Sequence, residues 1–127
     1  MYEERAYDLV LGSDVLFYRG AAPHVANVVA RCVREGGCAL LGDPVRLNVD
    51  DFVSRLDDLG MQGDVRLFRK AAAVVAAVGD LAQREDAFVQ LKKAKLVVIT
   101  RRGEELSGST RALLDVVRAA TVSEEEA

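Results

Sequence analysis

Two short polar segments, each directly after an apolar run, carry the residues best suited to chemistry. Ser13 and Asp14 follow the run Leu9–Gly12, and Asp43 follows the run Cys38–Gly42. A carboxylate just past a strand end can accept hydrogen bonds from a hydroxyl or an ammonium, and it can orient an amine or take its proton. Polar residues at the carboxyl ends of parallel strands also lie where open α/β sheets bind ligands. Ser13 and Asp14 therefore mark the edge of a candidate site; the alternative is that Asp14 only caps the following turn.

Aromatic and basic residues flank both segments. Phe17 and Tyr18 can wall off the apolar stem of a substrate or hold a cation on their π faces. They can equally pack the loop against the sheet, as aromatic residues commonly do. Arg46 can clamp a carboxylate or stack on a ring. In the plainer alternative, Asp43 and Arg46 form a local ion pair in a turn stiffened by Pro44.

Other reactive residue types fit structural roles better. His24 is the single histidine and falls in the first turn of an expected helix, where a surface or capping role is favoured because a catalytic base needs an orienting partner. Cys32 and Cys38 lack metal-ligand spacing and fall on different expected elements, which favours two small core residues in a reducing compartment. The sequence has no dinucleotide fingerprint, phosphate-binding loop, nucleophile elbow or zinc-ligand cluster.

Length, composition and charge limit the classes of protein to which this chain can belong. The chain has 127 residues, half of them hydrophobic, which fits a single domain over residues 1–127 with a sizeable core. The net charge is −3 and the basic residues are scattered, so nucleic-acid binding has little support. No apolar run approaches the roughly 20 residues of a membrane span. Residues 1–5 lack the order of a signal peptide. We therefore expect a cytoplasmic protein.

The apolar spacing predicts alternating strands and helices. The first four elements read strand, helix, strand, helix, the pattern of a parallel sheet. Strands are expected over about 7–11, 38–42, 64–68 and 95–101, and helices over about 23–35, 48–60 and 109–120, with a mostly helical stretch over 71–94.

Turn and cap residues set the expected boundaries. Gly36 and Gly37 predict a left-handed cap at the end of the first helix. Asn48 is expected to be the N-cap of the second helix, followed by Asp50 and Asp51 in its first turn. The acidic segment Ser123–Ala127 is expected to be a frayed tail.

Two stretches together resemble a known family. "YDLVLGSDVLFY" over residues 7–18 and "GGCALLGDPVR" over residues 36–46 resemble the second half of the seven-stranded S-adenosylmethionine-dependent methyltransferases. Within that family they are similar to the branch that methylates protein lysines, which has an Asp-x-x-Tyr motif after its fourth strand. The resemblance covers about Tyr7 to Phe68 well and the remainder in outline.

The resemblance implies roles for individual residues. Gly12 and Ser13 would lie against the cofactor, and Asp14 would face the target amine. Phe17 takes the position of the motif's tyrosine, so either Tyr18 substitutes for it or the hydroxyl is dispensable. Asp43 and Arg46 would line the substrate side of the cleft.

The resemblance also implies a partial Rossmann-like fold: an α/β domain with a mostly parallel sheet, flanking helices and a late antiparallel strand. The family builds its cofactor site mainly from its first three strands, and this chain resembles only the carboxyl-terminal half. We therefore expect a lysine-bearing protein as substrate, little activity from this chain alone, and a second chain over the exposed first strand. The alternatives are a non-catalytic interaction module derived from such an enzyme, and an unrelated small α/β domain.

Overall fold

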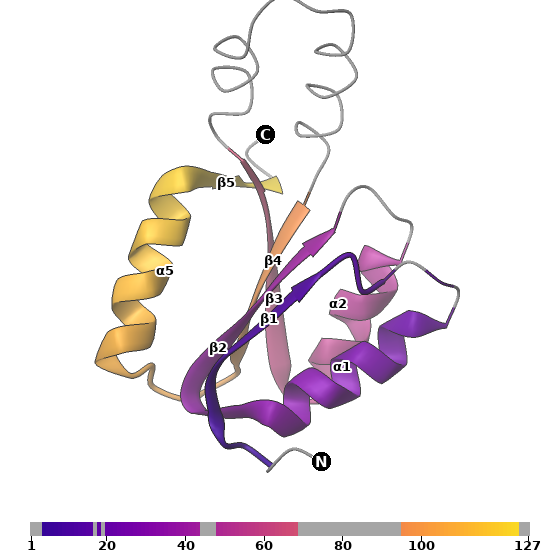
Figure 1. Cartoon of the computed structure of the whole chain (residues 1–127), viewed down its shortest axis with the longest axis horizontal. Coiled ribbons are helices and arrows are strands. Elements are labelled where there is room, and N and C mark those ends of the chain that lie inside the picture. Colours follow the sequence, from indigo (N-terminus) through magenta and orange to yellow (C-terminus); the bar gives the residue numbers. More distant parts are fainter. Residues whose placement is uncertain (1–3, 17, 19, 44–47, 69–94, 125–127) are drawn as a thin grey trace, which may run out of the picture.

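The strands of the sheet do not follow their order along the chain. The computed structural model describes residues 4–16, 18, 20–43, 48–68 and 95–124 (Figure 1). The described strands lie side by side in the order β1 (Tyr7–Ser13), β2 (Val33–Asp43), β4 (Lys95–Arg101), β3 (Met61–Phe68) and β5 (Thr121–Ser123). The described helices are α1 (Ala21–Cys32), α2 (Val49–Asp58) and α5 (Gly108–Ala120).

The sheet is mixed. β1 and β2 pair in parallel, whereas β4 is antiparallel to both β2 and β3, and β5 is antiparallel to β3. The prediction of an α/β fold with a late antiparallel strand is confirmed. The prediction of a mostly parallel sheet is wrong, because one reversed strand inserted between β2 and β3 makes both of its pairings antiparallel. β1, β2 and β3 nevertheless point in one direction.

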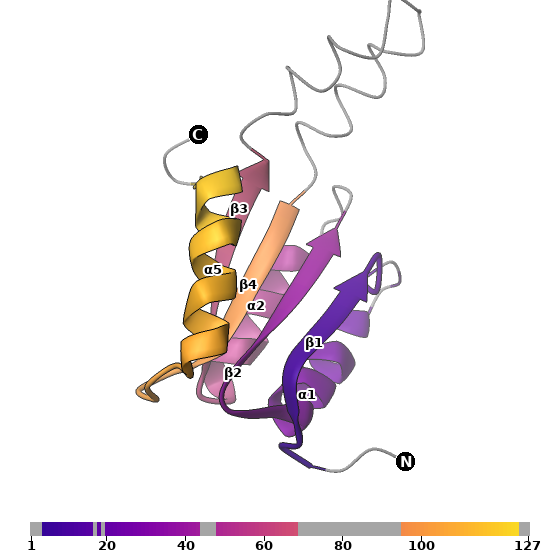
Figure 2. The same ribbon diagram turned by 60° about the vertical axis from the view of Figure 1, so that its left-hand side comes forward.

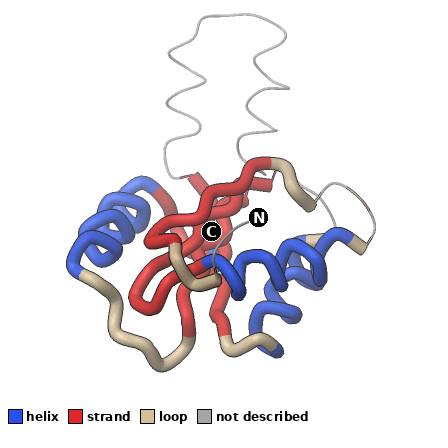
Figure 3. The backbone as a smooth tube through the Cα atoms, turned by 60° about the horizontal axis from the view of Figure 1, so that its bottom comes forward, coloured by secondary structure: helices blue, strands red, loops and turns tan. Residues whose placement is uncertain are grey.

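Helices cover both faces of the sheet. Alternate residues of β4 point to opposite faces: Val97 and Ile99 join the core under α1 and α2, whereas Val98 packs with Cys38 and with Leu114 of α5. Figure 2 shows α5 on one face of the sheet and α1 with α2 on the other, and Figure 3 shows the strands between these helices. No described helix combines the length and the apolar character that a membrane crossing requires.

The first helix ends earlier than expected. α1 spans Ala21–Cys32, and the expected glycine cap lies inside β2 instead. Gly36 has a φ of 78°, and a Cβ on Gly37 would lie 2.6 Å from the carbonyl oxygen of Asp8. These glycines form an irregular segment of β2 that lets β1 approach, so the two residues permit a close strand contact rather than a helix cap.

The remaining element boundaries agree only in part with those predicted from the sequence. β4 lies where it was expected, and α2 ends at Asp58, two residues before the expected end, with Gly60 following it at a φ of 77°. β3 begins at Met61, earlier than expected. Ser123, the first residue of the expected frayed tail, pairs with Arg66 of β3, and residues 125–127 lie outside the described residues. The expected helical stretch over 71–94 lies outside the described residues.

β1 is more exposed than its apolar sequence would suggest, because apolar runs usually mark strands that are covered on both faces. Among the described residues, no strand pairs with its outer edge. Tyr7, Leu9 and Leu11 are 42%, 40% and 69% exposed. β1 is therefore an apolar edge strand, which agrees with the exposed edge that the resemblance implies.

Candidate functional site

The carboxyl ends of β1 and β2 meet at one rim. Ser13 pairs with Gly42 in the parallel ladder, and the Asp14 backbone N–H donates to the Gly42 carbonyl oxygen over 2.9 Å. That bond continues the ladder by one residue and sets Asp14 beside Asp43. The expectation that these two acidic residues share one edge of the sheet is confirmed.

The two carboxylates differ in environment. Asp14 is exposed, and its backbone has a φ of 54°, in the left-handed region that Asp tolerates better than most residues. Asp43 is only 2% exposed. The arrangement therefore offers solvent one accessible carboxylate at the rim, with a second one buried next to it.

The loop after Asp14 is fixed by an unexpected clamp. Asn48 occupies the N-cap position of α2, but its side chain makes no capping bond. The Asn48 Nδ2 donates instead to the carbonyl oxygens of Leu16 and Tyr18, over 2.7 and 3.1 Å. Leu16 is 1% exposed and anchors the loop in the core. Asn48 therefore ties the start of α2 to the loop that carries the candidate residues.

A shallow apolar groove of about 340 Å³ runs along the α1 side of β1. Gly12 and Tyr18 line it, together with apolar residues of α1 such as Val25 and Val28. His24 lines it as well, exposed on the first turn of α1. An apolar channel beside an exposed carboxylate suits a ligand with an aliphatic stem and a cationic head.

The structure brings together most of the predicted site residues. Gly12 and Ser13 end β1, Asp14 and Asp43 lie at the shared rim, and Tyr18 is 46% exposed beside the groove. Phe17 and Arg46 lie outside the described residues. Tyr18 is thus the one described aromatic residue of the motif that can wall the groove.

Both cysteines behave as core residues. Cys32 and Cys38 are free thiols and buried, on α1 and β2 respectively. Burial raises the pKa of the Cys38 thiol. It also raises the pKa of the Cys32 thiol, against an opposing effect of the nearby Arg31 charge. Raised thiol pKa values leave little thiolate at neutral pH, so neither cysteine is suited to act as a nucleophile.

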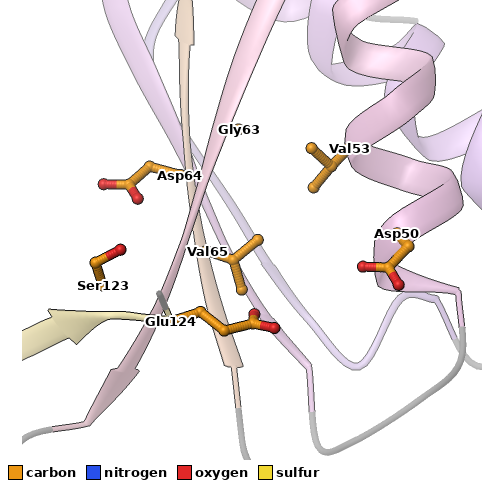
Figure 4. Close-up of a pocket in the computed structure, with 7 residues that line it drawn as sticks. All are labelled: Asp50, Val53, Gly63, Asp64, Val65, Ser123 and Glu124. Carbon is orange, nitrogen blue, oxygen red and sulfur yellow. The ribbon is translucent and has the colours of Figure 1, made fainter. Parts of the chain in front are cut away.

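A second hollow lies near the opposite edge of the sheet from β1, between α2, β3 and the end of β5 (Figure 4). It has a volume of about 480 Å³ and is lined by carboxylates of three elements, Asp50 of α2, Asp64 of β3 and Glu124 after β5. Asp64 pairs with Arg66 at 3.0 Å and Glu124 with Lys95 at 3.2 Å. Across the part of the chain that the structure describes, no three potential metal ligands gather. Most of the acidic lining is therefore engaged in ion pairs.

Sequence reasoning missed the Asn48 clamp and the groove. An Asn before an acidic first turn signals an N-cap, and nothing local distinguishes a capping side chain from one that reaches another loop. The sequence did contain one sign of the groove: Val25 and Val28 make the apolar face of α1 wider than the part that packs in the core.

A scan against models of protein families and a search of curated proteins gave no match to this chain.

Proposed function

We propose that this chain forms part of an S-adenosylmethionine-dependent protein-lysine N-methyltransferase. The observation that carries the proposal is the shared rim at which Asp14 and Asp43 end two adjacent parallel strands, joined by the Asp14–Gly42 backbone bond. Ligands of open α/β sheets bind at this edge. The rim falls on the two stretches whose sequences resemble the family.

The strand arrangement supports the proposal further. β1, β2 and β3 point in one direction, and the reversed β4 lies between the last two of them. A late antiparallel strand of this kind is what the resemblance implies. Fold alone does not define an activity, so the proposal depends on the rim residues.

The described residues fit one edge of the proposed cofactor. When bound, S-adenosylmethionine supplies an activated methyl group on a positively charged sulfur. Gly12 and Ser13 end β1 at the rim, where a glycine leaves room for close approach. A Cβ on Gly12 would lie 3.1 Å from Leu41 Cγ and would narrow the adjoining groove. The described residues thus fit the end of the cofactor that carries the methyl group, while its nucleoside needs further protein surface.

The chain's own side chains supply a site for a lysine amine. Asp14 is the exposed carboxylate that can accept a hydrogen bond from the amine, orient it and take its proton. Tyr18 and the apolar groove can hold the aliphatic stem of the lysine and exclude water from it. The resemblance also assigns Asp43 and Arg46 to the substrate side; Asp43 is buried beside Asp14, and Arg46 lies outside the described residues.

Calorimetric titration with S-adenosylhomocysteine tests the proposal. We expect a measurable heat of binding that is lost in Gly12→Val, because the added side chain fills the space beside Leu41. Gly108→Val is the matched control, because a Cβ at Gly108 meets nothing within 4 Å. Thermal melts of both variants establish that they fold. Titrations without heat from the folded wild-type chain would contradict the cofactor proposal.

A non-catalytic interaction module derived from a methyltransferase is the second candidate. The exposed apolar side chains of β1 favour it, because a strand with an open edge can bind another chain by strand addition. In that case the chain binds a protein partner but gives no heat with S-adenosylhomocysteine.

A further inference from the structure

The two edges of the sheet are built differently. The β5 edge is a strand of three residues, and short edge strands are one way in which proteins avoid unwanted pairing. The β1 edge is a strand of seven residues with the sequence YDLVLGS, which contains neither proline nor lysine. β1 carries one charged residue, Asp8, which is engaged by Arg34, and it is neither short nor interrupted by proline, so its edge is suited to pair with another strand.

The surface around β1 is apolar on both faces of the sheet. Leu9 and Leu11 are exposed and pair with Cys38 and Leu40, which pack on the α5 side, and Leu11 also borders the groove. On the other side, Val28 of α1 is 44% exposed and lines the groove. Exposed apolar surface around an open edge is typical of an interface. We propose that a second copy of this chain pairs with β1 and extends the sheet across a two-fold axis. The pairing does not depend on the methyltransferase proposal.

Symmetry restricts how two copies of β1 can pair. A two-fold axis perpendicular to the sheet makes the strands antiparallel and keeps each face on its own side. Residues on the same face must then lie opposite each other, so the axis passes midway between the two copies of one residue, which pairs with itself. Centring on Val10 gives the longest overlap, because Val10 is the middle of the strand Tyr7–Ser13.

Charge selects the same register. With Val10 at the axis, Leu9 of one copy meets Leu11 of the other, and Asp8 meets Gly12. A shift of the axis to Leu11 would set Asp8 against Asp14. Like charges directly opposite destabilise a strand pair.

A shift of the axis to Leu9 shortens the ladder instead, because it pairs only residues 7–11 of the strand and leaves Gly12 and Ser13 without a partner strand residue. The strand is therefore complementary to itself in the register that pairs it along its whole length.

The backbone has the correct orientation for this pairing. The Asp14 N–H points at β2, and N–H groups alternate in direction along a strand. The backbone groups of Leu9 and Leu11 therefore point away from β2, toward the open edge. In the Val10 register these groups bond across the axis, and the two Val10 residues form a non-hydrogen-bonded pair with close side chains.

Sedimentation equilibrium tests the interface. We expect the average mass of the wild-type chain to rise with concentration from one chain toward two. Leu11→Lys should hold the mass at one chain, because two lysines then lie in the leucine cluster. Val116→Lys is the matched control, since Val116 is 68% exposed on α5, away from β1, and should dimerise like the wild type. A thermal melt shows whether Leu11→Lys is folded.

Two results would overturn the proposal. A one-chain mass at every concentration would mean that another partner, or none, covers β1. Dimerisation of folded Leu11→Lys equal to that of the wild type would place the contact on a different surface.

Oxidative cross-linking tests the register. Val10→Cys should form an intermolecular disulfide, because the two Val10 Cβ atoms would lie about 4.5–5.5 Å apart. The wild-type chain should stay uncross-linked, because Cys32 and Cys38 are both buried. Leu11→Cys should cross-link far less, since its neighbour across the axis is Leu9. Efficient cross-linking through Leu11→Cys and none through Val10→Cys would overturn the Val10 register.

Discussion

The Asn48 clamp gives a prediction that opposes the one from capping statistics. Asn and Asp are comparable N-caps, and an acidic residue at a helix start gains about 0.3–1 kcal/mol from the helix dipole. A capping role therefore predicts that Asn48→Asp is neutral or stabilising. The structure predicts a loss of stability, because the Nδ2 group is a donor to two carbonyl oxygens and a carboxylate donates to neither.

The magnitude follows from the two bonds. A typical hydrogen bond contributes a net of about 0.5–1.5 kcal/mol, so the two bonds to Leu16 and Tyr18 are worth about 1–3 kcal/mol. The favourable interaction of the new carboxylate with the helix dipole offsets about 0.3–1 kcal/mol of that loss. Combining the two opposing terms gives a range of about 0–2.7 kcal/mol, so we expect Asn48→Asp to lower the free energy of unfolding by a central value of about 1.4 kcal/mol.

Urea unfolding measures this change as a lower midpoint at an unchanged m value. Asn27→Asp is the matched control: the Asn27 Oδ1 accepts a 3.4 Å bond from Arg55, and a carboxylate keeps that acceptor. Its midpoint should stay close to that of the wild type. An Asn48→Asp midpoint equal to or above the wild-type midpoint would refute the clamp.

Three further substitutions test other features of the fold. Gly37→Ala should lower the free energy of unfolding by more than about 2 kcal/mol in urea titration, because its Cβ would lie 2.6 Å from the Asp8 carbonyl oxygen, whereas Gly108→Ala, with open space around it, should be neutral or stabilising. Phe52→Ala should cost about 3–5 kcal/mol by the same assay, since Phe52 is fully buried under the sheet, and a loss below about 1 kcal/mol would contradict its place in the core. Burial raises the pKa of Cys38, so the folded state retains a proton that the unfolded chain releases; unfolding midpoints should fall as pH rises above about 8.5, and Cys38→Ala should show a shallower fall. Equal slopes for the two chains would contradict that assignment.

Local patterns predicted the elements, and the pairing depended on distant contacts. The β-branched run of β4 and the spacing of Phe52 and Leu56 on α2 located their elements, because burial imposes the period of each. Gly36 and Gly37 were misread because a left-handed glycine serves a helix end and a strand irregularity equally well. Only the approach of Asp8 distinguishes these roles, and that contact is invisible locally.

The candidate site was predictable to a similar extent. Asp14 and Asp43 each follow an apolar run, and the carboxyl ends of parallel strands meet at one edge of a sheet, so the sequence was enough to locate both residues on one rim. The Asn48 clamp was not predictable, since it joins residues that lie 30 and 32 positions apart in the chain. The exposure of Leu11 was likewise hidden, because an apolar run reads as a buried strand whether or not a neighbour covers it.

The place of β4 in the middle of the sheet bears on the order in which the protein folds. Residues 95–101 bridge β2 and β3, which do not pair with each other. During synthesis, β4 therefore leaves the ribosome after β2 and β3, the two strands that it joins. Until β4 has been made, the edges of β2 and β3 that will pair with it stay unpaired. Such long-range closure is slow and leaves nascent chains prone to aggregate. Pulse-labelling hydrogen exchange during refolding should find β3 and β4 becoming protected together, and protection of β3 well before β4 would contradict this sequence of events.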